Sequence, residues 1–198
     1  MIWFILNFIS GSIPWSLILG KLILNKDIRD FGDQNPGVAN LWKAGGWKIG
    51  NIGLILDISK AAIPVYLTIN YLKLTNLELI LISIAPILGH SFSPFLKFNG
   101  GKSLAASGGV WISVSGGIAV PIIIISLGIF HSLQKNHSWT IMLTMLSILI
   151  FYLLTDFDYN IIFIWSINII LLIYKHRIEM TEPIIFRHWP NIFKGNQS

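Results

Sequence analysis

Long apolar stretches separated by short polar breaks set the pattern of this chain. A helix needs about 20 predominantly apolar residues to span a bilayer. The stretches of about this length, or slightly shorter, are Ile2–Leu24, Ile49–Leu72, Leu77–Leu96, Trp139–Leu154 and Tyr159–Tyr174. In the first stretch, small residues such as Gly11 would let a neighbouring helix pack closely. The pattern predicts an all-α fold, a polytopic bundle of membrane helices that forms a single domain over residues 1–198.

Residues 103–133 form either one further crossing of the membrane or two. Ser103–Ser115 has only 13 residues, which is short for a full crossing. Gly116 and Gly117 break the apolar pattern, and Gly117–Leu133 continues it. With two crossings, the first would be a short helix paired with the second inside the bundle.

The distribution of charge decides between these alternatives. Basic residues concentrate in the connections 25–48 and 97–102 and in the tail, residues 176–198, whereas the 155–160 turn carries only aspartates. Two crossings place all three basic regions on one side, which the positive-inside rule identifies as the cytoplasm. We therefore predict seven transmembrane helices with a short fourth helix, an N-terminus outside, and a cytoplasmic tail that lies at the membrane interface.

The composition agrees with a membrane protein. Hydrophobic residues make up 54% of the 198 residues and charged residues only 12%, about half the charged share of soluble domains. The net charge of +5 follows the membrane topology, so we expect no nucleic-acid partner. The absence of cysteine excludes disulfides and thiolate chemistry. The first apolar stretch lacks the features of a cleaved signal, and we expect it to be retained.

The polar break before residue 103 has the chemistry of an anion site. Gly100 and Gly101 give the backbone access to positive φ angles, Lys102 follows, and a helical pattern begins at Ser103. Exposed backbone N–H groups, a helix N-terminus and a lysine together favour a phosphate. The alternative is an ordinary membrane turn with one cytoplasmic lysine. A Walker A loop is excluded, because Leu96 stands where that motif requires glycine.

A second polar stretch, residues 31–46, is longer than a plain connection needs. Asn35 and Asn40 offer amide groups, Lys43 offers a cation, and Gly37 belongs to a turn sequence. We expect this connection, the Lys102 break and the tail to converge on the cytoplasmic side. The alternative is a surface loop that only anchors at the lipid headgroups.

Charged and polar side chains within the predicted spans need partners. Asp57 and Lys60 share a helix face at i, i+3 spacing, so we predict an ion pair that locks helix packing, with a cavity-facing role as the alternative. His90 is either a packing residue or part of the site. The remaining histidines, to which we assign no role, are His131, His137 and His188. No cluster has the spacing of metal ligands, so we expect no metal and no cofactor.

These features together resemble the bacterial membrane-integral glycerol-3-phosphate acyltransferases, the PlsY family. The matching motifs, in chain order, are Gly11-Ser-Ile-Pro14, Asp27-Ile-Arg29, Asn35-Pro-Gly37 with Asn40, Leu56-Asp57 with Lys60, Gly89-His90, Phe95-Leu-Lys-Phe98 with Gly100-Gly-Lys102, Tyr174-Lys-His-Arg177 and Thr181-Glu182. Several ordered motifs along almost the whole chain make the resemblance specific.

The resemblance implies transfer of a fatty acyl group from acyl phosphate to glycerol 3-phosphate, giving lysophosphatidic acid and phosphate. It implies a monomer in the bacterial inner membrane, among membrane lipids, with a cytoplasmic site and no metal or nucleotide. No side-chain base is implied, and a substrate phosphate would take the hydroxyl proton. The implied catalytic residues are Lys102, His176 and Lys43, and the implied substrate-binding residues are Asn35, Gly37, Asn40, Gly100, Gly101, Ser103 and His90.

The chain departs from the family pattern at five site positions. Asp33 replaces a serine, Gln34 a glycine, Lys43 an arginine, Ser103 a glycine and Glu179 an asparagine. An aspartate beside a phosphate would repel it, and lysine keeps the charge of arginine but not its bidentate fork. These changes predict a divergent member. A non-catalytic paralogue that binds a phosphorylated ligand and a small transporter stay open as alternatives.

Overall fold

The computed structural model describes residues 1–155 and 158–187. Over these residues the regular secondary structure is helical apart from one isolated β-bridge between Gln134 and Phe186, so the all-α prediction is confirmed. The α-helices are α1 (Ile2–Ser12), α2 (Trp15–Leu24), α3 (Val38–Tyr71), α4 (Asn76–Ser91), α5 (Leu104–Val114), α6 (Ala119–Leu133), α7 (His137–Thr155) and α8 (Tyr159–His176). The 3₁₀ helices are η1 (Ile28–Asp30), η2 (Pro94–Leu96) and η3 (Glu179–Thr181).

Among the described residues, five helical stretches are long and apolar enough to cross a membrane. They are Ile2–Leu24, Val38–Tyr71, Asn76–Leu96, His137–Thr155 and Tyr159–His176, and two shorter apolar helices are α5 and α6. Many large apolar side chains on these helices are exposed, among them Ile63 and Ile125. Such a surface suits lipid rather than water.

Two helix boundaries differ from the sequence prediction. The first predicted span is broken between α1 and α2 at Pro14, whose ring fixes φ and lacks the N–H that would continue the helix. The predicted polar loop ends earlier than expected, because α3 already begins at Val38. Gly46, with φ of 74° and ψ of −177°, interrupts this long helix, so the glycines near residue 46 mark a kink within it.

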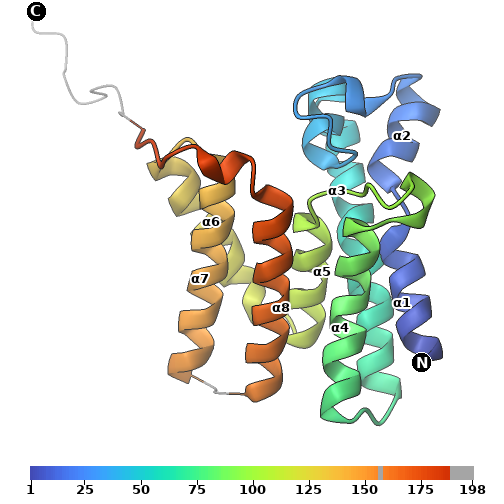
Figure 1. Cartoon of the computed structure of the whole chain (residues 1–198), viewed down its shortest axis with the longest axis vertical. Coiled ribbons are helices and arrows are strands. Elements are labelled where there is room, and N and C mark those ends of the chain that lie inside the picture. The colour runs from blue at the N-terminus through green and yellow to red at the C-terminus, as the bar shows by residue number, and fades with distance from the viewer. Residues whose placement is uncertain (156–157, 188–198) are drawn as a thin grey trace, which may run out of the picture.

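Residues 103–133 form a pair of short helices, as the charge distribution predicted. Gly116 and Gly117, with φ of 58° and 91°, reverse the chain between α5 and α6, a backbone that glycine adopts without strain. The helix α5 lies in the middle of the bundle, between α1–α4 and α6–α8 (Figure 1). A Cβ atom on Gly109 would lie 2.3 Å from the Ile58 carbonyl oxygen, so the glycine permits the close contact between α5 and α3.

Buried polar side chains tie the helices together inside the bundle. Lys60 Nζ lies 2.7 Å from Asp57 Oδ1, both side chains are only 2% exposed, and Ser16 Oγ donates to Asp57 Oδ2. Lys60 also donates to the Ile13 carbonyl at the break between α1 and α2, at 2.6 Å. The predicted ion pair is confirmed. The two charges are thus bonded to each other, to Ser16 and to the backbone, and Lys60 also lines a small cavity beside His90.

The connections that carry the sequence motifs gather at one end of the bundle. Residues 25–37, residues 92–103 and residues 177–187 lie at the end opposite Met1 (Figure 1). Backbone hydrogen bonds from Lys135 N to Ile185 O, 2.8 Å, and from Arg187 N to Leu133 O, 2.9 Å, fix the tail beside the α6–α7 connection. The interfacial role predicted for the tail falls largely on residues after Arg187, including His188, which lie outside the described residues.

Candidate active site

Lys102 is the point where three distant connections meet. Its Nζ atom lies 2.5 Å from Asp33 Oδ2, on the connection between α2 and α3, and 2.5 Å from Glu179 Oε1, in η3. The Lys102 side chain is 19% exposed, and the two carboxylate side chains are 39% and 35% exposed. The expected convergence of the two loops and the tail is therefore present in the structure.

Lys102 and Asp33 stabilise each other's ionised forms. Burial favours the neutral form of Asp33, but the hydrogen bond and the charge of Lys102 outweigh burial and lower the pKa of Asp33. Burial likewise opposes the charge on Lys102, but Asp33 and Glu179 outweigh it and raise the pKa of this lysine. Lys102 is thus a cation over the whole physiological pH range.

The connection before α3 is folded around Asp33 and Asn40. Asn40 is 1% exposed, and its Nδ2 donates to Asp33 Oδ1 and to the Asn35 carbonyl, both at 2.9 Å. The Asn35 backbone N–H donates to Asp33 Oδ1 at 3.3 Å. Gly37 is the residue that precedes α3. The predicted binding residues of this stretch are therefore neighbours of Asp33, and through it of Lys102.

Lys43 lies at the outer edge of this group. A Cβ atom built on Gly32 would lie 2.5 Å from Lys43 Nζ and 2.3 Å from Asn40 Oδ1, so Gly32 lets both side chains close over the loop. Lys43 is exposed, and the described residues give it no carboxylate partner. It presents a cation one helical turn after Asn40, beside the loop that holds Asp33.

Gly100 and Gly101 serve close packing rather than unusual backbone angles. Neither has a positive φ; the left-handed residues of this break are Lys97, Phe98 and Ser103, with φ of 52°, 62° and 63°. A Cβ on Gly100 would lie 2.1 Å from the His90 carbonyl oxygen, and one on Gly101 2.3 Å from His90 Nε2. The expectation of positive φ at the glycines was wrong, because their lack of a side chain is needed against His90.

The helix α5 begins next to this packed break. Its N-cap residue, Ser103, makes no capping hydrogen bond; instead its hydroxyl pairs with Ser91 Oγ at 2.5 Å and reaches the Ile87 carbonyl at 3.2 Å. The first N–H groups of a helix lack intrahelical partners and carry partial positive charge. The N-terminus of α5 therefore adds partial positive charge beside Lys102, whose own charge is paired with Asp33 and Glu179.

Lys175 is a site component that the sequence did not identify. Its Nζ atom donates to the carbonyl groups of Ser91, at 2.8 Å, and Gly100, at 3.1 Å, and lies over the Phe92 ring. It therefore fixes the glycine break against α4 from the end of α8. The motif around residues 174–177 was the only signal in the sequence, and it did not distinguish Lys175 from its neighbours.

His176 is oriented by a hydroxyl from the neighbouring helix. Ser138 Oγ lies 3.0 Å from His176 Nδ1, and the histidine is 2% exposed. Among the described residues, His176 Nε2, Glu179 Oε2 and Asn40 Oδ1 have no hydrogen-bond partner although they are buried. Buried polar atoms normally have partners, so these three atoms are available to bound water or to a polar ligand.

His90 lines a small polar cavity on the other side of Gly101. The cavity has a volume of about 10 Å³, enough for about one water molecule. Its walls are formed by Ser12, Pro14, Pro36, Lys60, His90, Ser93, Leu96 and Gly101. This cavity is too small for a phosphorylated substrate, and a larger ligand there would require some of its lining side chains to move.

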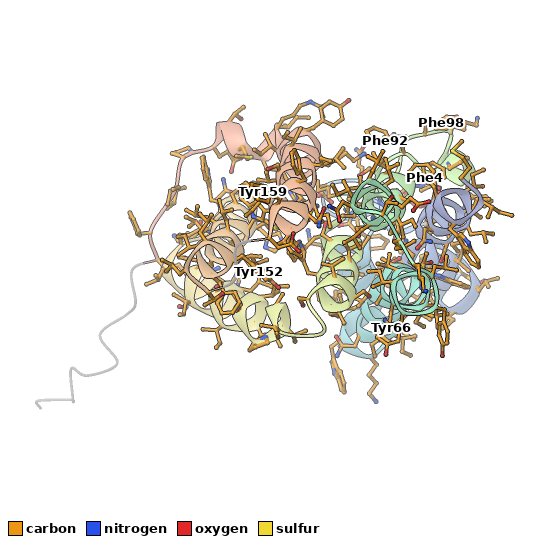
Figure 2. The ribbon with its side chains drawn as sticks, turned by 90° about the horizontal axis from the view of Figure 1, so that it is seen from below. Phe4, Tyr66, Phe92, Phe98, Tyr152 and Tyr159 are labelled. Atoms are coloured by element: carbon orange, nitrogen blue, oxygen red, sulfur yellow. The ribbon has the colours of Figure 1, made fainter. Side chains whose placement is uncertain are left out.

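Exposed aromatic side chains flank the site at the surface of the bundle. Phe95 and Phe98, in the break before Lys102, are 61% and 66% exposed, and Phe98 lies at the outer edge of the bundle (Figure 2). Large exposed apolar side chains of this kind suit contact with lipid rather than water. The site thus borders an apolar edge of the bundle.

The described residues thus form an all-helical bundle with apolar, membrane-length helices and a charged group around Lys102 at one end. The family model described as glycerol-3-phosphate acyltransferase matches residues 1–192. The glycerol-3-phosphate acyltransferase of Pelagibacter ubique (strain HTCC1062) is 35% identical over 172 residues, which cover 86% of each chain. The chain therefore belongs to the glycerol-3-phosphate acyltransferase family, and the resemblance is confirmed.

Solved structures agree with this family. Crystal structures of PlsY (YgiH), described as an integral membrane glycerol 3-phosphate acyltransferase, match with TM-scores of 0.82 and 0.80. They are 28% and 27% identical, and each match covers 91% of this chain and 89% of the other. One is the glycerol 3-phosphate form and the other the lysophosphatidic acid form. The fold is thus that of an integral membrane acyltransferase.

Proposed function

We propose that the protein transfers a fatty acyl group from acyl phosphate to a hydroxyl group of glycerol 3-phosphate. The hydroxyl oxygen attacks the acyl carbonyl carbon, the bond from that carbon to the phosphate oxygen breaks, and phosphate leaves. The hydroxyl proton goes to a phosphate oxygen of one of the substrates. The products are lysophosphatidic acid and inorganic phosphate, so neither a metal nor a nucleotide is required.

The observation that carries this proposal is the meeting of three connections at Lys102. Both substrates are phosphate anions, and Lys102, once released by its carboxylates, would provide with the N-terminus of α5 a positive corner for a phosphate or a developing oxyanion. Lys43 supplies a second cation nearby, and the free Nε2 of His176 supplies a hydrogen-bonding group. Holding two substrates side by side at these groups would supply much of the rate acceleration.

The same proposal includes the membrane topology. The helices α5 and α6 would complete seven crossings, with Met1 outside the cell and the Lys102 end in the cytoplasm of a bacterial inner membrane. The clustering of basic residues at the Lys102 end supports this orientation. Because the grouped side chains all come from one chain, we also expect a monomer to be sufficient for activity.

An acyl-transfer assay tests the proposal. Membranes that contain the protein should form lysophosphatidic acid from acyl phosphate and glycerol 3-phosphate. Lys102→Ala should abolish the product, whereas Lys73→Ala, which removes an exposed lysine from the opposite end, should not. Absence of product from the folded, unmodified protein would overturn the proposal.

One observation favours a second candidate, a non-catalytic member of the family. Two carboxylates already neutralise Lys102, so its charge is not free in this state. Binding of glycerol 3-phosphate without any acyl transfer, with acyl phosphate present, would identify this second candidate.

A further inference from the structure

We propose that Asp33 and Glu179 are an internal competitor for the substrate phosphate at Lys102. The two carboxylates hold the lysine until an anionic ligand displaces at least one of them, and they thereby set the affinity of the site for phosphate. This inference rests on the proposed function, because it concerns the same anion site.

The bonding of Asp33 resembles that of a bound anion. Its two oxygens accept hydrogen bonds from Lys102 Nζ, Asn40 Nδ2 and the Asn35 backbone N–H. A phosphate oxygen would use the same kinds of donor: a lysine, a side-chain amide and a backbone N–H. The Asp33 carboxylate therefore occupies a ready-made anion position.

The balance of charge at Lys102 opposes a second anion. Two ionised carboxylates against one ammonium leave one negative charge in excess, and like charges at close range repel strongly even at a partly hydrated site. Lys43, beside Gly32, offsets part of this excess but forms no ion pair among the described residues. A phosphate can thus share Lys102 only after a carboxylate has moved away.

The carboxylates can move without unfolding their segments. The backbone carbonyl of Glu179 is held separately by Asn136 Nδ2 at 3.0 Å, so its side chain can swing while the chain stays in place. The side chains of Asp33 and Glu179 are 39% and 35% exposed, whereas that of Lys102 is 19% exposed. Water can therefore solvate the released carboxylates, and separating such partly exposed ion pairs requires little free energy.

A buried ring nitrogen next to Glu179 marks where the ligand would enter. Glu179 Oε2 and His176 Nε2 have no partner among the described residues, and the histidine is 2% exposed. A phosphate that displaces the Glu179 carboxylate from Lys102 would gain the lysine and approach this ring nitrogen. When the ligand leaves, the carboxylates return to Lys102 and favour its release.

The test is a binding titration of the purified full-length protein with inorganic phosphate and with glycerol 3-phosphate. Glu179→Gln and Asp33→Asn keep the side-chain shape but remove the charge, and each should lower Kd roughly tenfold, in the range of a displaced ion pair plus like-charge repulsion. The double variant should bind more tightly than either. Asp30→Asn, a matched exposed carboxylate that is not paired with Lys102, should leave Kd unchanged.

Unchanged or weaker binding in both single variants, with unchanged melting temperatures, would overturn the inference. If the unmodified protein binds too weakly to measure, appearance of binding in the double variant supports the inference, and its continued absence overturns it. Acyl transfer is not part of this readout. Tighter binding without turnover would contradict the proposed function alone, whereas normal turnover with unchanged Kd would contradict only the internal competitor.

Discussion

Two lysine–carboxylate groups in this protein have similar chemistry but lie in different surroundings. Asp57 and Lys60 lie within α3, with both side chains 2% exposed. Asp33, Lys102 and Glu179 lie at one end of the bundle, with side chains 19% to 39% exposed. Water cannot reach the Asp57–Lys60 pair to replace either partner, whereas water can solvate Asp33 and Glu179 when they separate from Lys102. The comparison indicates that the Asp57–Lys60 pair stabilises the fold, whereas Lys102 can exchange a carboxylate for an anionic ligand.

The largest expected effect is on the buried pair. Lys60→Met leaves the Asp57 carboxylate without its cation inside the bundle and should lower the free energy of unfolding by about 3–5 kcal/mol. Denaturation in detergent micelles measures this loss. The double variant Asp57→Asn with Lys60→Met removes both charges and should recover most of the stability. Equal losses in the single and double variants would show that the charge imbalance is not the cause.

The second effect separates stability from activity. Lys102→Met removes the cation at the meeting point of the connections and should lower the rate of acyl transfer roughly 100-fold or more. Its effect on unfolding should stay within about 1 kcal/mol, because the pairs it breaks are partly exposed. Loss of stability as large as that of Lys60→Met would erase the distinction between the two groups.

The third effect concerns Lys175, which fixes the glycine break from α8. Lys175→Met loses two charge-assisted hydrogen bonds to the Ser91 and Gly100 carbonyls, each typically worth about 1.5–3 kcal/mol when intact. We expect a higher KM for glycerol 3-phosphate with a smaller change in kcat, because Lys175 positions the site without bonding to the three charges. In Lys175→Arg, the KM should lie between that of Lys175→Met and that of the unmodified protein. An unaltered KM in Lys175→Met would contradict this role.

The smallest effect is the pH dependence of the free energy of unfolding that Asp33 and Lys102 contribute. The lowered pKa of Asp33 means that its stabilising contribution is present above about pH 4 and lost as pH falls through the lowered value. The raised pKa of Lys102 means that its contribution is present below about pH 10.4 and lost as pH rises through the raised value. The stability difference between the unmodified protein and Asp33→Asn should therefore be constant from pH 5 to 9 and about 1 kcal/mol or less.

The check is to measure the difference in unfolding free energy between the unmodified protein and Asp33→Asn in detergent from pH 5 to 9. A difference that vanishes already at neutral pH would contradict the pairing of Asp33 with Lys102.

Much of the fold follows from local patterns in the sequence. Apolar length predicted the helices, and the i, i+3 spacing predicted the Asp57–Lys60 pair. Gly116 and Gly117 predicted the reversal between α5 and α6, because their positive φ angles serve a local turn. The start of α3 was missed, because the turn sequence Asn35-Pro-Gly37 and the glycines Gly45 and Gly46 resemble the two ends of a single long loop.

The site depends on distances along the chain that no local pattern encodes. Lys102 is 69 residues from Asp33 and 77 from Glu179, and the two carboxylates, taken singly, looked like unfavourable changes beside a phosphate. Their shared partner is visible only in three dimensions. The same holds for Ser138, which orients His176 from 38 residues away, and for the packing of Gly100 and Gly101 against His90.

The central claim is that Lys102, at the openable end of the bundle, is the anchor for a substrate phosphate. Titration of the purified protein and of Lys102→Ala with glycerol 3-phosphate tests it most directly, in the Glu179→Gln background where binding should be tightest. We predict saturable binding that is lost in the Lys102→Ala variant. Equal Kd values with and without the lysine would contradict the claim.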